Sequence, residues 1–217
     1  MKGVIFDMDG VLVDSIKCHI ISWVEAFKNK GLIVSEEVLS LFEGMSYDET
    51  IDYVCEKNDV TFSDEERINI IDTKKKVFDD IFELKTYGGI VDFVSLLKNQ
   101  GFKLAVVTGS RKDFANEVLS HFFEGLFDVV VTGSDVERGK PHPEPFLKAV
   151  DILGLEKKDL IVIENAPLGI KSAKDAGLKV IALETTLDKK HLGEADIIFE
   201  NHEGLFNYFS GLIAPRS

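Results

Sequence analysis

The chain begins with a strongly apolar run that ends in a pair of acids: residues 3–15 read GVIFDMDGVLVDS. The run at 3–6 is typical of a buried parallel strand. Asp7 and Asp9 are two residues apart, so their carboxylates extend from the same side of the strand's end. Like charges held together repel unless a cation or a reaction requires them. We therefore expect a functional acidic pair here, with Gly10 allowing the sharp turn that follows.

The rest of the chain predicts alternating strands and helices. Five more short runs rich in valine and isoleucine predict strands at 103–108, 128–132, 160–164, 179–183 and 196–199. Amphipathic helical patterns, each followed by a glycine that favours a helix end, occur at 90–99, 112–122, 144–153 and 168–176. This alternation predicts an α/β fold with a doubly wound parallel sheet. Such sheets bind ligands beyond the carboxyl ends of their strands.

The segment from residue 15 to residue 84 differs in composition from the rest of the chain. It holds 16 acidic and 8 basic residues, and its apolar residues, such as Trp23, fall at helical spacing. We predict a small all-α helical bundle at 15–84, inserted into a Rossmann-like core formed by 1–14 and 85–217. The three lysines at 74–76 are expected on a solvated helix face, the alternative being that one of them reaches a cleft.

Composition excludes several classes of protein. The chain has 217 residues, 45% of them hydrophobic, which is enough to bury a substantial core. Its net charge of −13 repels nucleic acids and anionic membranes, so we expect neither as a partner. Cys18 and Cys55 are too few for a disulfide framework and lack the spacing of a zinc site. No apolar stretch approaches the ~18 residues that span a bilayer, so we expect a cytoplasmic monomer or weak dimer.

Polar residues follow the predicted strand at 103–108. A hydroxyl, free backbone N–H groups and the start of the next helix would together bind an anion, and an arginine would add charge. An ordinary strand-to-helix turn is the alternative. The candidates for phosphate binding are Thr108, Gly109, Ser110 and Arg111.

Two later strand ends carry further candidates. Lys140 stands in the run GKPHPEP at 139–145, where the prolines restrict the backbone and would hold the lysine as a charge clamp. His142 in the same run is expected to pack within the loop. Glu164 ends the strand predicted at 160–164 and Asn165 follows it; with Asp7 they offer the oxygen ligands that suit a hard cation such as Mg²⁺.

These residues suit phosphoryl transfer. One carboxylate near a divalent cation attacks phosphorus, while a second protonates the leaving oxygen and later activates water. A lysine and Mg²⁺ offset the charge of the transferring group. If Asp9 is the acid, its environment must raise its pKa when substrate is bound, because a free aspartate loses its proton near pH ~3.9.

In this order, the motifs resemble the haloacid dehalogenase superfamily, in particular its β-phosphoglucomutase-like and phosphoglycolate-phosphatase-like branch. The resemblance spans nearly the whole chain, and the run DMDGVLVDS at 7–15 matches the first motif position by position. It implies that Asp7 is the nucleophile, and that Asp9 is the acid/base and, through its backbone carbonyl, a metal ligand. Thr108 and Lys140 would hold the phosphoryl group. The helical insert would be a mobile cap domain. The implied metal ligands are Asp7, Asp9, Glu164 and Asn165.

Two positions depart from that pattern. Relatives commonly carry a second acid where this chain has Asn165, so we expect a weaker Mg²⁺ site in which Glu164 carries more of the burden. In the cap, His19 and Trp23 match mutase-like members, but Tyr47 stands where a mutase has an arginine for the substrate's far phosphate.

The sequence therefore predicts a Mg²⁺-dependent phosphatase that hydrolyses a small phosphomonoester, a sugar or organic-acid phosphate, through an aspartyl-phosphate. A β-phosphoglucomutase-like hexose-phosphate mutase is the main alternative. A 2-haloacid dehalogenase would leave Asp9 and the metal site idle. A non-catalytic phospho-ligand binding module would not need both Asp7 and Asp9.

Overall fold

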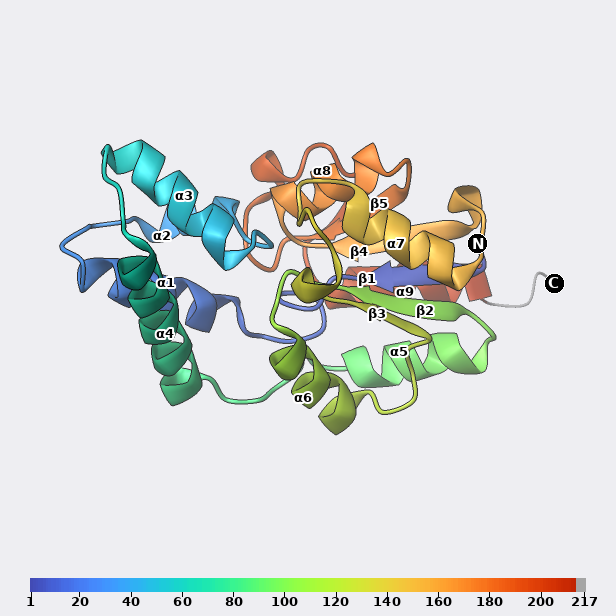
Figure 1. Cartoon of the computed structure of the whole chain (residues 1–217). Coiled ribbons are helices and arrows are strands. Elements are labelled where there is room, and N and C mark those ends of the chain that lie inside the picture. The colour runs from blue at the N-terminus through green and yellow to red at the C-terminus, as the bar shows by residue number, and fades with distance from the viewer. Residues whose placement is uncertain (214–217) are drawn as a thin grey trace.

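The centre of the molecule is a six-stranded parallel sheet. A computed structural model describes residues 1–213 and gives the strand order β3-β2-β1-β4-β5-β6 (Figure 1). The strands are β1 Gly3–Phe6, β2 Lys103–Val107, β3 Val129–Val131, β4 Leu160–Glu164, β5 Lys179–Leu183 and β6 Ile197–Phe199. The predicted doubly wound α/β fold is confirmed.

The register of the three central strands positions the chemistry. Phe6 of β1 is paired with Val106 of β2 and with Ile163 of β4. The residues just beyond these pairs therefore reach the same edge of the sheet, since parallel strands run in one direction. Asp7 thus lies between the ends of β2 and β4, although more than 90 residues separate β1 from β2 along the chain.

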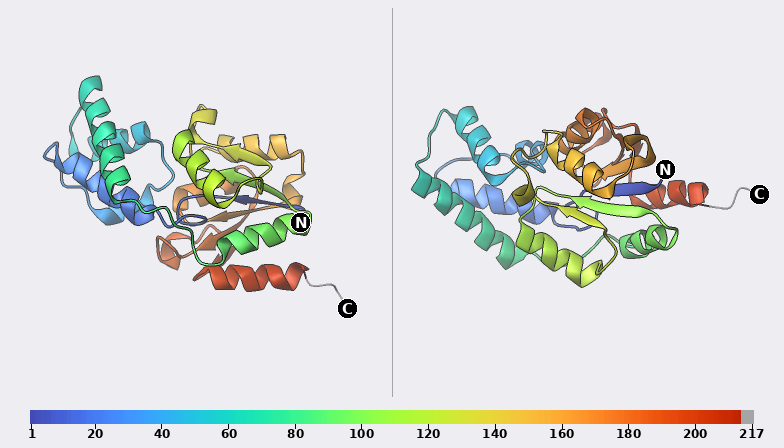
Figure 2. Two further views of the ribbon diagram at one scale, coloured as in Figure 1. Left: turned by 90° about the horizontal axis from the view of Figure 1, so that it is seen from below. Right: turned by 45° about the vertical axis from the view of Figure 1, so that its right-hand side comes forward.

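Helices cover both faces of the sheet. Phe93, Phe114 and Phe209, on three different helices, belong to the apolar cluster on one face, and Phe146 and Ile170 belong to that on the other. Figure 2 shows α5 and α9 side by side along the first face. The helices of the first face are α5 Ile90–Asn99, α6 Lys112–Phe122 and α9 His202–Ile213, and those of the second are α7 Glu144–Leu153 and α8 Pro167–Asp175. Single-turn helices occur at Gly133–Asp135, Lys157–Asp159 and Lys189–His191.

The predicted insert forms four helices beside the carboxyl edge of the sheet, on the left in Figure 1. Ser46 and Ser63 begin two of them with capping boxes, each serine paired with the glutamate three residues on. The chain enters and leaves this region through two segments that pair with each other, since Val13 bridges to Thr86 and Asp14 forms an ion pair with Lys85. The helices are α1 Ile16–Lys28, α2 Glu36–Leu41, α3 Tyr47–Asn58 and α4 Asp64–Ile81.

Most element boundaries agree with those predicted, and the differences have local causes. The strand predicted at 128–132 is shorter because the Asp128 carboxylate accepts from the backbone N–H of Leu104, and Thr132 begins a helical turn with Asp135. α8 begins one residue early because Pro167 suits the first helical position. Among the described residues, no helix is long and apolar enough to cross a membrane.

The insert has an apolar core of its own, so its free energy of unfolding should depend on the large side chains buried there. Phe27 is fully buried and stacks on Trp23 at 5.4 Å between ring centroids. Phe27→Ala should lower the free energy of unfolding by about 3–5 kcal/mol, because it removes buried apolar surface and leaves a cavity. Ile33→Ala, at a position that is 95% exposed, should change it by less than about 0.5 kcal/mol. Urea unfolding would measure both, and equal losses would show that the insert has no packed core.

Candidate active site

The floor of the site is a buried lysine shared by two carboxylates. The Nζ atom of Lys140 lies 2.5 Å from Oδ1 of Asp7 and 2.7 Å from Oε1 of Glu164, and all three side chains are buried. Burial raises the pKa of Asp7 to about 8, against the opposing effect of Lys140. Burial opposes the charge of Lys140, yet Asp7 and Glu164 together raise its pKa above the ordinary value. Two buried carboxylates share one ammonium, so the site favours a further cation.

Glu164 is fixed by the start of α8 as well as by Lys140. Its Oε2 accepts hydrogen bonds from the backbone N–H groups of Asn165 at 2.7 Å and Ala166 at 2.9 Å. A Cβ atom on Gly169 would lie 1.6 Å from Oε1 of Glu164, so only glycine leaves room for this carboxylate. Glu164 therefore acts chiefly as the anchor that orients Lys140.

Asn165 presents an unpaired oxygen. Its Nδ2 donates to Oγ1 of Thr186 at 2.7 Å, which fixes the amide, while its Oδ1 is buried and has no hydrogen-bond partner within residues 1–213. Gly10 is packed against it, and a Cβ there would lie 2.1 Å from Nδ2. A buried acceptor without a donor is costly, and a bound cation would remove that cost.

The residues present fit a hard cation held by mixed oxygen ligands. Across the described part of the chain, no three His, Cys, Asp or Glu side chains gather as a ligand set. The fitting donors are instead the Asp7 carboxylate, the backbone carbonyl implied for Asp9 and Oδ1 of Asn165, which match the oxygen preference of Mg²⁺. The sequence expectation that Glu164 would carry more of the metal is not favoured, because both its oxygens already accept hydrogen bonds.

Asp9 is surrounded by hydrogen-bond donors from both sides of the site. Its Oδ1 accepts from Oγ of Ser15 at 2.5 Å and contacts Nε2 of His19 at 3.1 Å, while its Oδ2 accepts from Oγ of Ser110 at 2.6 Å and Oγ1 of Thr108 at 3.3 Å. Burial opposes ionisation, but His19, Ser110 and Ser15 outweigh it and hold the pKa of Asp9 below its usual range. The acid role requires a raised pKa, so Asp9 must lose some of these hydrogen bonds during the reaction.

A buried lysine of the cap supports His19. Nζ of Lys74 lies 2.8 Å from Nδ1 of His19 and 3.1 Å from the hydroxyl of Tyr47. Because the ammonium donates to Nδ1, the ring presents a donating Nε2–H to Asp9. Burial lowers the pKa of Lys74 to about 8. The expectation that the lysines at 74–76 lie on a solvated face is therefore wrong for Lys74, which is fully buried. It does not line the cavity itself but contacts two residues that do, His19 and Tyr47.

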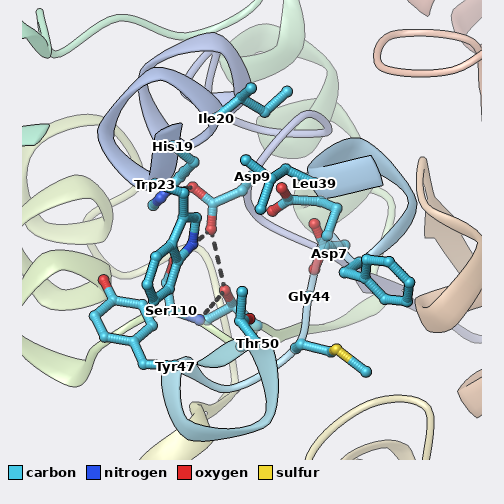
Figure 3. Close-up of a pocket in the computed structure, with 15 residues that line it drawn as sticks. Asp7, Asp9, His19, Ile20, Trp23, Leu39, Gly44, Tyr47, Thr50 and Ser110 are labelled. Atoms are coloured by element: carbon cyan, nitrogen blue, oxygen red, sulfur yellow. Dashed lines mark hydrogen bonds and ion pairs between the residues drawn. The ribbon is translucent and has the colours of Figure 1, made fainter. Parts of the chain in front are cut away.

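A cavity lies between this floor and the cap, with about 540 Å³ of empty space when the part open to solvent is counted (Figure 3). Asp7, Asp9 and Ser110 border it from the core, and cap residues including Trp23 and Tyr47 border it from the other side. The cap is packed tightly on the core here: a Cβ on Gly109 would lie 2.5 Å from the carbonyl oxygen of Gly44. The cavity is thus partly enclosed by contact between the two regions.

The structure brings most of the predicted site residues together. Seven of them meet at the carboxyl edge of the sheet: Asp7, Asp9, Thr108, Ser110, Lys140, Glu164 and Asn165. The three predicted cap residues line the cavity: His19, Trp23 and Tyr47. Arg111 does not line this cavity; its guanidinium binds both carboxylate oxygens of Asp113, and the residue borders an adjoining hollow together with His19 and Ser110. His142 packs within its loop as expected, accepting from the N–H of Glu144.

Sequence reasoning missed two residues of the site. Lys74 belongs to a run of three lysines that looks solvated, and only the pairing of α1 with α4 buries it. Glu43 lines the cavity from the loop after α2, and nothing in its sequence neighbourhood set it apart from the other acids of the segment.

Comparison with known proteins agrees with this geometry. The family model described as haloacid dehalogenase-like hydrolase matches residues 4–183. The chain belongs to the haloacid dehalogenase-like hydrolase family.

Relatives of this hydrolase include phosphatases that match it over most of their length. It is 32% identical to validoxylamine A 7'-phosphate phosphatase of Streptomyces hygroscopicus subsp. limoneus, covering 92% of this chain and 93% of that protein. It is 30% identical to hexitol phosphatase A of Escherichia coli, covering 93% and 92%. A β-phosphoglucomutase structure from Clostridium difficile shares the fold, with a TM-score of 0.85, 24% identity and coverage of 98% and 97%. The predicted family, fold class and enzyme class, a phosphoric monoester hydrolase, are confirmed.

The depressed pKa of Lys74 predicts a pH-dependent stability. Between pH about 8 and the ordinary value of 10.5, the unfolded hydrolase binds a proton at Lys74 that the folded one has lost, so folding is favoured as pH rises. Relative to Lys74→Met, the wild type should gain up to about 3 kcal/mol of unfolding free energy across that range. Urea unfolding of both proteins at pH 8 and pH 10 would measure it. Lys76→Met, on the same helix and exposed, is the control, and an unchanging difference for Lys74 would contradict the assignment.

Proposed function

We propose that this hydrolase is a Mg²⁺-dependent phosphatase that removes the phosphoryl group from a small phosphomonoester, a sugar or organic-acid phosphate, through an aspartyl-phosphate. The observation that carries the proposal is the buried Asp7 at the floor of a partly enclosed cavity, held by Lys140, with the unpaired oxygen of Asn165 just after the end of the neighbouring strand β4. The arrangement supports Asp7 as nucleophile, Lys140 as a fixed cation and Asn165 as a metal ligand, because strand ends of such sheets bind substrates.

The side chains supply the two steps of the reaction. A carboxylate oxygen of Asp7 attacks phosphorus and forms a P–O bond, while the ester P–O bond breaks and the leaving alkoxide takes a proton from Asp9. Asp9 then accepts a proton from water as the water attacks the acyl phosphate, which releases inorganic phosphate and restores Asp7. Lys140 and the hydroxyl of Thr108 stabilise the charge of the transferring group. Mg²⁺, when bound by Asp7, Asp9 and Asn165, would neutralise phosphoryl oxygens.

Asp9 must change its hydrogen bonds to act as the acid. Four side chains donate hydrogen bonds to its carboxylate, and this arrangement favours the ionised form of Asp9. Ser15 and His19 come from the cap side, and Thr108 and Ser110 from the core. We propose that substrate binding draws Thr108 and Ser110 to the phosphoryl oxygens, which removes two of the donors and raises the pKa of Asp9.

The mutase alternative is less well supported. A mutase holds a second phosphate, yet no lysine or arginine is among the described residues that line the cavity. Tyr47 stands in place of the expected arginine, and Arg111 is engaged by Asp113 at 3.0 and 2.9 Å.

The expected partner is a small phosphorylated metabolite. A cytoplasmic location and a monomer or weak dimer remain predictions.

Asp7→Asn should abolish turnover, because the amide is a poor nucleophile, while leaving the fold intact. We expect phosphate release from a panel of sugar, polyol and two-carbon phosphates, in the presence of Mg²⁺, to fall at least about a thousandfold. Asp92→Asn, at an exposed position on α5, is the control for the loss of one charge. If the wild type releases no phosphate from the panel, the phosphatase proposal fails. A substantial residual rate in Asp7→Asn would exclude the covalent route.

Asn165 is the position that tests the metal site. Asn165→Asp should tighten Mg²⁺ binding about tenfold, because it adds a negative charge to a site with an amide ligand. Asn165→Ala should weaken it at least about tenfold, because the unpaired Oδ1 is lost. Calorimetric titration with Mg²⁺ measures both without turnover. Unchanged affinity in both variants would show that Asn165 does not bind the metal.

A further inference from the structure

The loop that follows β5 reaches the candidate metal site, although the mechanism above assigns it no part. Ala182 near the end of β5 is paired with Glu164 of β4, so the residues beyond β5 lie beside those that follow β4. Oγ1 of Thr186 in this loop accepts a hydrogen bond from Nδ2 of Asn165 at 2.7 Å. Among residues 1–213, this is the only hydrogen bond of the Asn165 side chain.

The nitrogen end of the Asn165 amide is enclosed from a second side. Gly10 is packed so closely against it that a Cβ atom there would lie 2.1 Å from Nδ2. Thr185 donates from Oγ1 to the carbonyl oxygen of Gly10 at 2.6 Å, so two consecutive threonines hold Gly10 and the amide nitrogen. The end of the amide that remains for a ligand is Oδ1, which is buried and has no partner in the described part of the chain.

A cation can bind this amide in one orientation only. It binds Oδ1, while the two N–H groups of Nδ2 need an acceptor elsewhere. Asn165 has no exposed surface, so water does not reach Nδ2, and a buried donor without an acceptor is costly. The hydroxyl oxygen of Thr186 supplies an acceptor in the orientation that leaves Oδ1 for the cation.

We infer that Thr186 is a positioning residue of the metal site: its hydroxyl oxygen holds the Asn165 amide with Oδ1 available to a divalent cation. The inference rests on the proposed metal-dependent function and adds a residue from a third strand end to the site. Thr186 is matched to asparagine in particular. An ionised carboxylate at position 165 would have two equivalent oxygens and no N–H group, and would need no acceptor.

Calorimetric titration of the substrate-free protein with Mg²⁺ tests the inference. Thr186→Val keeps the shape of the side chain but removes its oxygen, so the amide would hold the cation-binding orientation for only part of the time. The affinity for Mg²⁺ should then fall at least about fivefold. Thr186→Ser keeps the oxygen and should remain within about twofold of the wild type. Thr61→Val makes the same change at an exposed position before α4 and should also remain within about twofold.

The Asn165→Asp background separates positioning of the amide from a general loss of loop structure. The Thr186 hydroxyl would turn to donate to the new carboxylate and would compete with the cation for its charge. Adding Thr186→Val to Asn165→Asp should therefore raise the Mg²⁺ affinity or leave it within about twofold. The inference is overturned if Thr186→Val weakens Mg²⁺ binding equally in both backgrounds, or in neither.

The side-chain amide of Asn165 gives a second readout that needs no metal. In nuclear magnetic resonance spectra, its hydrogen-bonded N–H should exchange with solvent at least about tenfold more slowly in the wild type than in Thr186→Val. Thr186→Ser should retain the slow exchange. Equal exchange in the wild type and Thr186→Val would show that Thr186 does not hold the amide.

Phosphate release separates this inference from the proposed function. The wild type and Thr186→Val are assayed with Mg²⁺ on the same panel of phosphomonoesters. If Mg²⁺ binding depends on Thr186 as expected but the wild type releases no phosphate, the phosphatase proposal fails and the role of Thr186 stands. Phosphate release by a wild type whose Mg²⁺ affinity is unaffected by Thr186→Val would do the reverse. A wild type that binds no Mg²⁺ would overturn the inference.

Discussion

The buried ammonium of Lys140 is the interaction on which the rest of the site depends. It joins Asp7 after β1 to Glu164 at the end of β4, and removing one member of such a buried set leaves an uncompensated charge that costs about 3–5 kcal/mol. The sheet register brings the two carboxylates to one edge, and the start of α8 holds Glu164 in place. The absence of a side chain at Gly169 is part of the same arrangement, because any Cβ there would collide with Glu164.

The cap and the core both contribute hydrogen-bond donors to Asp9. The core supplies Asp7, Lys140 and the phosphate-binding hydroxyls, but Asp9 receives its donors from both regions, through Ser15 and His19 on one side and Ser110 on the other. Lys74 sets the orientation of His19 from behind. In the proposed reaction, the acid/base Asp9 is thereby coupled to the position of the cap through hydrogen bonds, whereas the clamp Lys140 meets the cap only through packing against Gly44.

The same division separates chemistry from selectivity. In the proposed reaction, the residues that would handle the phosphoryl group follow strand ends, whereas the remaining lining of the cavity comes from cap helices and the loop at 42–46. Glu43 in that loop and Tyr47 at the start of α3 both line the cavity.

Local pattern was sufficient for the strands, most helix limits and the acidic pair, because a buried parallel strand is a continuous apolar run and its end must carry the polar residues that follow it. Lys140 and Glu164 could also be predicted, because Lys140 lies in a proline-rich loop and Glu164 is the last residue of a strand. Folding in three dimensions was needed for the burial of Lys74, the clamping of Arg111 by Asp113 and the unpaired oxygen of Asn165. Each of these depends on a distant or rotamer-dependent contact, such as that of Asn165 with Thr186, and side-chain pairing of this kind leaves no periodic trace in the order of residues.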